Sequence, residues 1–351
     1  MAAAKEVEGL DCGAGAGEGI RLVLRTRFGE MYDQRAALSG VEDVKGVHDM
    51  RVASRRLRSA LRDFKGFYDR KTLPKRRLKE VARALGEVRD QDVAVEALEE
   101  MRSKTSDAEA EGIELLIAER RVLRAQARAR LEPFVAVQSF GNLRAKFLSW
   151  LEQTGGAGRD KKNVRITLGP AHAMSFRGAG VEVIESRLAE LLELSDSLNH
   201  PFDFEPLHAM RIAAKRLRYA LELFSSCWGG ALKPLAREVS GLQTALGDLR
   251  DCDTWIADLG ARLDRRRELP EVAAASAADP RVRPAAVWLL SHYTKERGEH
   301  FCRALARWQK WEAEGFFNRV RDSLHNPPPP KAEAPAGEPG TGATTGPTPT
   351  T

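Results

Sequence analysis

A basic, histidine-led segment occurs twice in this chain of 351 residues. The first copy spans 47–64 and the second 207–224, and ten of their eighteen aligned positions are identical. A second block, Leu-Gly-x-x-Arg-Asp-x-Asp, follows each copy, at 85–92 and at 246–253. Because two blocks recur in the same order, both halves of the chain are predicted to build the same structural unit.

Apolar residues recur at helical spacing along both halves, and almost no segment alternates with the period of a β-strand. The pattern predicts helices near 19–38, 45–68, 74–102 and 107–131, a short fifth around 139–153, and their repetition from about 180 to 324. The connections are short, so neighbouring helices should be antiparallel. The sequence therefore predicts an all-α fold of two pseudo-symmetric four-helix bundles with long antiparallel helices, produced by an internal duplication.

Composition divides the chain into five segments. A glycine-rich stretch starts at Gly155 and continues irregularly to Gly180, and the residues after Leu324 include no large apolar side chain to bury. We predict a disordered N-terminus at 1–16, a first helical half at 17–154, a linker at 155–180, a second helical half at 181–325 and a disordered tail at 326–351.

The positive charge of the chain is concentrated in one segment. The formal net charge is +6, yet residues 47–83 alone hold thirteen Lys and Arg against four Asp and Glu. Charge spread for solubility would be more even along the chain. The local excess indicates an anion-binding surface.

The cysteines and the hydropathy pattern bound the protein class. Cys12, Cys227, Cys252 and Cys302 include no C-x-x-C pair, so neither a disulfide framework nor a zinc knuckle is expected. No apolar segment of a signal peptide opens the chain, and no run of about 18 apolar residues could span a membrane. We expect a cytoplasmic protein with no cofactor and no membrane partner.

The repeated basic segment has two faces when drawn as a helix. Five cationic residues fall within roughly an 80° sector and apolar residues lie nearly opposite, over about 21 Å of helix. We call the cationic set the first stripe: His48, Arg51, Arg55, Arg58 and Arg62. The second stripe is His208, Arg211, Lys215 and Arg218, with Glu222 at the position of Arg62.

Such a stripe has two explanations. Arginines on one helix are often a solvated face or pair with nearby carboxylates. Solubility charge alone, however, gives no reason to keep the same phase in both halves. Arginine grips two phosphate oxygens with its planar fork and stays charged at physiological pH, so anion binding is the favoured interpretation.

The aspartates of the second block also allow two interpretations. Asp90 with Asp92, and Asp251 with Asp253, could hold a metal ion, but side chains two residues apart on a helix point about 160° from one another. We favour a structural role, in which one aspartate orients a stripe arginine. The glycines of the block, Gly86 and Gly247, would let a neighbouring helix approach closely.

The two histidines could be proton-switchable donors, metal ligands or phosphate acceptors. The surrounding arginines should lower their pKa and repel a cation, so no metal site is expected at His48 or His208. No nucleotide-binding glycine loop and no nucleophile with an assignable base is present, so catalysis has no support in the motifs.

Both stripes and both Leu-Gly-x-x-Arg-Asp-x-Asp blocks resemble the CHAD family of histidine-bearing helical domains, over roughly residues 17–325. The resemblance implies two facing helical bundles, a basic groove between them and inorganic polyphosphate as ligand; some members associate with polyphosphate granules. The implied binding residues are His48, Arg51, Arg55, Arg56, Arg58 and Arg62 with His208, Arg211, Lys215, Arg216 and Arg218. An E-x-E-x-K motif, which marks a triphosphate-tunnel domain in many relatives, is absent.

Three functions follow from these observations. The first is a polyphosphate-binding module without catalysis, whose affinity comes largely from counterion release. The second is an enzyme acting on polyphosphate or phosphorylated small molecules, with His48 or His208 as acid, base or acceptor and the Asp pairs holding Mg²⁺. The third, nucleic-acid binding, is disfavoured because Tyr219 is the main aromatic available for base stacking. Chain-length preference and oligomeric state are not encoded in any motif.

Overall fold

The computed structural model describes residues 5–38, 40, 42–153, 174–264, 268 and 270–326. The first half contains α1 (Ala16–Ala37), α2 (Val44–Asp63), α3 (Lys75–Arg102), α4 (Asp107–Val135) and α5 (Val137–Gln153). The second contains α6 (Phe176–Leu192), α7 (Phe204–Phe224), α8 (Leu232–Leu263), α9 (Glu271–Ala277), α10 (Val282–Ala313) and α11 (Phe316–His325), with short 3₁₀ turns η2 (Ser195–Asn199) and η3 (Ser225–Trp228). Throughout these residues the fold is all-α, as predicted, and it includes no β-strand.

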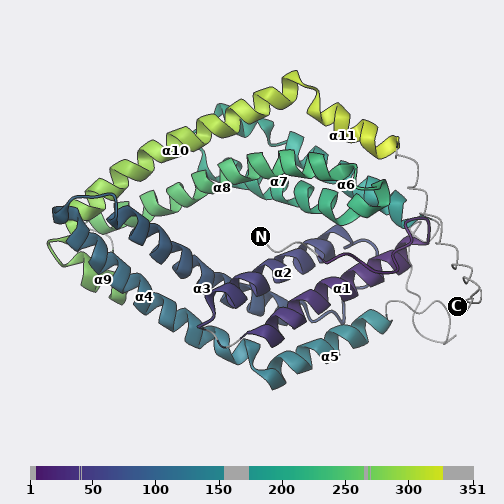
Figure 1. Ribbon diagram of the computed structural model, residues 1–351, viewed down its shortest axis with the longest axis horizontal. Helices are drawn as coiled ribbons and strands as arrows, with labels where there is room; N and C mark the ends of the chain where they lie inside the picture. Colours follow the sequence, from purple (N-terminus) through teal and green to yellow (C-terminus); the bar gives the residue numbers. More distant parts are fainter. Residues whose placement is uncertain are drawn as a thin grey trace, which may run out of the picture.

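The helices form two layers that meet at both ends of an elongated molecule (Figure 1). In the first layer α1 packs on α2, α2 on α3 and α3 on α4; in the second, α6 packs on α7, α7 on α8 and α8 on α10. The layers are joined by α1 and α2 against α6 and α7 at one end and by α4 against α10 at the other. The order of packing is thus the same in both layers, while their origin by duplication stays a prediction.

The buried core does not separate into one apolar cluster for each sequence half. The larger of two apolar clusters contains Phe64, which caps the C-terminus of α2, together with Phe176 of α6 and Phe224 of α7, and their ring centroids lie 5.0–6.2 Å apart. The smaller cluster, at the opposite end, combines Leu98 of α3 with Leu289 of α10. Each cluster takes side chains from both halves, so burial of apolar surface holds the two layers together.

Glycine permits the closest contacts between the layers. A Cβ atom on Gly19 of α1 would lie 2.4 Å from the Phe176 ring, and one on Gly112 of α4 would lie 2.2 Å from the Arg281 carbonyl oxygen. By contrast, a Cβ on Gly247 would meet nothing within 4 Å, and one on Gly86 only the Arg51 guanidinium at 4.0 Å. The prediction that Gly86 and Gly247 permit helix contact is therefore wrong.

The expectation of disorder over 1–16 is wrong for residues 5–16. The Ala16 amide donates to the Met174 carbonyl at 2.9 Å, and the Arg177 amide donates to the Cys12 carbonyl at 2.9 Å. Cys12 also forms a disulfide with Cys227, although the scattered cysteines predicted none. A segment poor in apolar residues can be ordered by backbone hydrogen bonds and a covalent link, neither of which composition reveals. Residues 1–4 lie outside the described chain.

Several predicted boundaries are also displaced. The helix predicted over 45–68 ends at Asp63, and α6 starts at Phe176, inside the stretch predicted as linker. The Ser175 hydroxyl accepts from the Gly178 amide at 3.1 Å and so caps α6. The helix therefore begins before Gly180, where the glycine-rich stretch was predicted to end. Residues 155–173 of that linker, residue 154 before it and residues 327–351 of the tail lie outside the described residues. No helix in the described chain is long and apolar enough to cross a membrane.

Candidate functional site

The first stripe lies on α2 and the second on α7, and the burial of the opposite faces orients both. Met50 and Leu57 of α2 and Met210 and Leu217 of α7 are fully buried. Asp43 caps α2, accepting from the Gly46 amide at 2.8 Å. The apolar faces thereby fix the direction of the cationic faces.

The two stripes face one another across the layers. Burial, followed by the charges of neighbouring cations, lowers the pKa of Lys215 on α7 to about 7. The cations that act on it are Arg55, Arg58 and Arg62 of α2 and Arg211 of α7. Burial also lowers the pKa of Arg211, and the charges of Arg55 and Arg51 lower it further. Residues 160 positions apart in the sequence therefore form one cationic cluster.

Most of this cluster has no carboxylate partner. Within the described residues, no ion pair is formed by Arg55, Arg58, Arg62 or Lys215. Five cations from two helices, held together without neutralisation, repel each other at distances where partial burial weakens screening. Such an arrangement is unfavourable for stability by itself and favourable for an arriving polyanion.

Carboxylates lie at one end of the cluster. Asp90 of α3 contacts Arg51 with 3.1 Å between Oδ1 and Nη2, as the sequence predicted for one aspartate of the block. Asp251 of α8, at the position equivalent to Asp90, acts in the opposite direction to burial and partly offsets the lowering of the pKa of Arg211. The first stripe is thus partly neutralised at Arg51 and forms no ion pair toward Arg62, whereas Glu222 stands at the matching end of the second stripe.

The second aspartate of each block points away from the stripes. Asp92 is buried and contacts Arg124 of α4 at 2.6 Å, and Asp253 is buried and contacts Arg297 of α10 at 2.6 Å. Each aspartate pair is therefore split between two surfaces, which is the geometry that the helical spacing predicted. Among the described residues no three His, Cys, Asp or Glu side chains are arranged to hold a metal ion.

The histidines begin the two stripes. Burial lowers the pKa of His48 below 6.5, and Arg89 and Arg51 lower it further. Burial also lowers the pKa of His208, with Arg211 and Arg250 acting in the same direction. Both imidazoles are consequently neutral at pH 7.

Three of the residues implied by the family resemblance have neighbours of their own. Arg216 forms an ion pair with Glu190. Arg218 is only 5% exposed, packs over the Tyr219 ring and contacts Glu222 at 3.5 Å. Arg56 lines a small cavity between α2 and α7. Because Glu222 replaces the position of Arg62, Arg218 has an intramolecular partner that Arg58 lacks.

Two arginines of the site were missed by the sequence reasoning. Arg89 acts on His48 and Arg250 acts on His208, from α3 and α8 respectively. Both belong to the Leu-Gly-x-x-Arg-Asp-x-Asp block, so the repeated arginine was the available signal.

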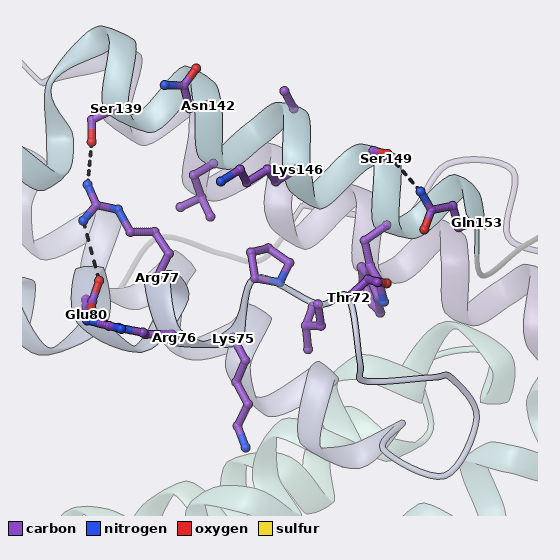
Figure 2. Close-up of a pocket in the computed structure, with 15 residues that line it drawn as sticks. Thr72, Lys75, Arg76, Arg77, Glu80, Ser139, Asn142, Lys146, Ser149 and Gln153 are labelled. Atoms are coloured by element: carbon purple, nitrogen blue, oxygen red, sulfur yellow. Dashed lines mark hydrogen bonds and ion pairs between the residues drawn. The ribbon is translucent and has the colours of Figure 1, made fainter.

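The large cavity between the start of α3 and α5, about 810 Å³, has a different character (Figure 2). Its two arginines share one carboxylate, since Arg76 and Arg77 contact Glu80 at 2.8 Å and 3.6 Å. Arg77 also donates to Ser139 of α5. Figure 2 shows Lys75 pointing away from Arg77 and Glu80. The cavity therefore offers less free positive charge than its lining suggests.

The comparison with known families agrees with the architecture and the motifs. The CHAD domain model matches residues 23–260, which is more than half of the chain, and the chain belongs to the CHAD-domain family. The match is shorter than the 17–325 expected from the motifs. None of the curated proteins compared with the chain matches it.

Two solved structures share the fold. The crystal structure of the CHAD domain from the plant Ricinus communis is similar with a TM-score of 0.63 and 21% identity, over 91% of this chain and 95% of that chain. PptA from Streptomyces chartreusis is similar with a TM-score of 0.59 and 19% identity, over 84% of this chain and 100% of that chain. At these identities the likeness concerns the fold alone.

Proposed function

We propose that this protein binds inorganic polyphosphate along the two facing stripes. The observation that carries the proposal is the cluster of Lys215 with Arg55, Arg58, Arg62 and Arg211, in which none of the five cations forms an ion pair in the described chain. Membership of the CHAD family, which is linked to polyphosphate, supports the same ligand.

A linear phosphate chain fits this arrangement better than a compact anion does. The first stripe extends over about 21 Å of helix, and the second stripe faces it, so successive phosphates can be contacted from two sides. Arginine forks hold pairs of phosphate oxygens without a unique register, which suits a repeating polymer. The role requires binding alone, with no bond broken, and polyphosphate granules are a place where such a module could act.

The first experiment is a titration of fluorescently labelled long-chain polyphosphate, competed with RNA and with orthophosphate at equal phosphate concentration. We expect unlabelled polyphosphate to compete much better than either. Each phosphate contact should contribute about −0.7 to the slope of log K against log salt, so a two-stripe site should give a slope of about −4 or steeper. A slope near zero, or RNA competing as well as polyphosphate, would contradict the proposal.

The enzymatic alternative is separated by incubation. Polyphosphate of defined length is mixed with the protein and Mg²⁺, and chain length is followed by gel electrophoresis. We expect no shortening beyond that in a protein-free control. Shortening that is lost on replacing His48 and His208 by Ala would replace the binding proposal with the enzymatic one.

A further inference from the structure

A second cationic cavity of about 300 Å³ lies where the first stripe ends. The last turns of α2, the 64–74 connection and the first turns of α3 form its walls. Its lining contains six cations and no carboxylate: Arg58, Arg62, Lys65, Arg70, Lys75 and Lys79, together with Leu61, Tyr68, Leu73 and Leu78. The volume is at the lower end of the range usual for small-ligand sites.

None of the six cations forms an ion pair within the described residues. Cations close by are paired, since Arg76 and Arg77 contact Glu80 and Arg83 contacts Glu87 at 3.4 Å. A lack of carboxylates nearby therefore does not explain why the six cations form no ion pair. The unpaired cations are the ones that line the cavity.

The placement of the lysines on α3 also runs against the usual preference. Lys75 is the first residue of α3 and Lys79 lies one turn later, while the first turn contains no acidic residue. The positive end of a helix dipole disfavours cations at these positions by a few tenths of a kcal/mol or more each. An anion bound between these lysines and Arg62 would remove the conflict.

The charge along the first stripe increases toward this cavity. Arg51 forms an ion pair with Asp90, whereas Arg58 and Arg62 are shared between the stripe and the cavity and form no ion pair in the described chain. A linear polyphosphate carries about one charge on each internal phosphate and additional charge on each terminal phosphate. The densest negative charge of the ligand would therefore be placed best in the cavity.

We propose that this cavity is a separate anion subsite that binds the doubly ionised terminal phosphate of a condensed phosphate chain, whether the end of a long polymer or free tripolyphosphate. The inference rests on the proposed function and deepens it, because it adds a chain-end subsite and a direction to the site. A chain would run along the first stripe from His48 and end between α2 and α3.

Among the described residues of the second half, the corresponding positions do not repeat this set of cations. Glu222 stands at the position of Arg62, Ser225 at that of Lys65, and Arg218 is buried against Glu222. Because the two ends of a linear polyphosphate are identical, one subsite in a two-fold arrangement of helices would hold either end at a single position of the protein.

The test uses one variant with its matched control. The cavity variant is Arg70→Gln, Lys75→Gln and Lys79→Gln, and the control is Lys71→Gln, Arg76→Gln and Arg83→Gln, which removes the same charge from exposed positions outside the cavity. The probes are tripolyphosphate, long-chain polyphosphate and long-chain polyphosphate whose two ends are capped as phosphoramidates. Affinities are measured by calorimetry with the full chain, and melting temperatures establish that both variants fold.

We expect the cavity variant to bind tripolyphosphate about tenfold or more weakly than the wild type, and the control to change by less than about threefold. Uncapped long chains should lose affinity in the cavity variant, and capped long chains should not. Equal losses in variant and control, or for capped and uncapped chains, would overturn the subsite while leaving the two stripes in place. Absence of long-chain binding to the wild type would instead overturn the proposed function.

Discussion

The helices α2 and α7 are formed by two copies of one sequence segment, yet their C-terminal ends differ in charge. On α2, Arg58 and Arg62 have no ion-pair partner in the described chain and open onto a cationic cavity. On α7, Arg218 is buried and contacts Glu222. One exchange between repeated positions, Arg62 for Glu222, accompanies the change from a free cationic surface to a neutralised one.

The comparison teaches that a repeated motif need not mean a repeated function. The matching apolar positions are buried in both copies, as at Met50 and Met210, while the polar positions differ in their partners. We infer that α2 contributes most of the binding energy and that α7 completes the cluster mainly through Arg211 and Lys215.

The largest effect is expected from reversing charge on α2. Arg55→Glu, Arg58→Glu and Arg62→Glu together should weaken polyphosphate binding by about a hundredfold or more, since each loses a charge-assisted contact and adds repulsion. The salt slope should become shallower by about 2. Arg211→Glu with Lys215→Glu should weaken binding less, and a larger loss on α7 would contradict the division.

Lys215 should make binding depend on pH. In the free protein its pKa of about 7 leaves it largely neutral at pH 8, and a bound polyanion favours the charged form, so affinity should fall by up to about tenfold per pH unit above pH 7. Lys215→Arg should flatten this profile. Binding enthalpies in buffers of different ionisation heat would report the proton taken up.

The same residue should lower stability in the free protein. A lysine whose folded pKa lies below its ordinary value of 10.5 destabilises the folded state while it is charged, and this cost is relieved as pH rises from about 7 to about 10.5. Lys215→Met should therefore raise the melting temperature at pH 6 while weakening polyphosphate binding. An unchanged melting temperature would show that Lys215 is better solvated than its surroundings indicate.

Making α7 resemble α2 should strengthen binding moderately. Glu222→Arg removes the partner of Arg218 and adds a cation at the position of Arg62, so affinity should rise about three- to tenfold. Glu222→Gln serves as the control and should give a smaller gain. Weaker binding in Glu222→Arg would show that Glu222 positions the second stripe and does not simply shorten it.

The smallest effect is expected from the histidines. Replacing His48 and His208 by Ala should weaken binding about two- to threefold at pH 7, because burial keeps both imidazoles neutral there. The loss should be greater at pH 6, where a bound phosphate raises their pKa and the wild type gains charge. Complete loss of binding at pH 7 would identify the histidines as essential.

Much of the fold could be predicted because its determinants are periodic. The helical spacing of residues such as Leu57 and Leu85 indicated long helices, and the phase of Arg51, Arg55 and Arg58 placed them opposite the apolar face. Boundaries set by single contacts were missed, including the Ser175 cap and the end of α2 at Asp63. The ordered residues 5–16 and the disulfide of Cys12 with Cys227 were missed for the same reason.

The sequence by itself determined that the chain is helical, that two cationic stripes exist and that each lies on the polar face of an amphipathic helix. Periodicity is a local property, so it can be read without coordinates. The tertiary structure alone decided that the stripes face each other, that Arg218 is buried while Arg58 is free, and that Lys75 and Lys79 meet Arg62 around one cavity. These facts depend on distances between residues far apart in the chain, and side-chain charges act through space.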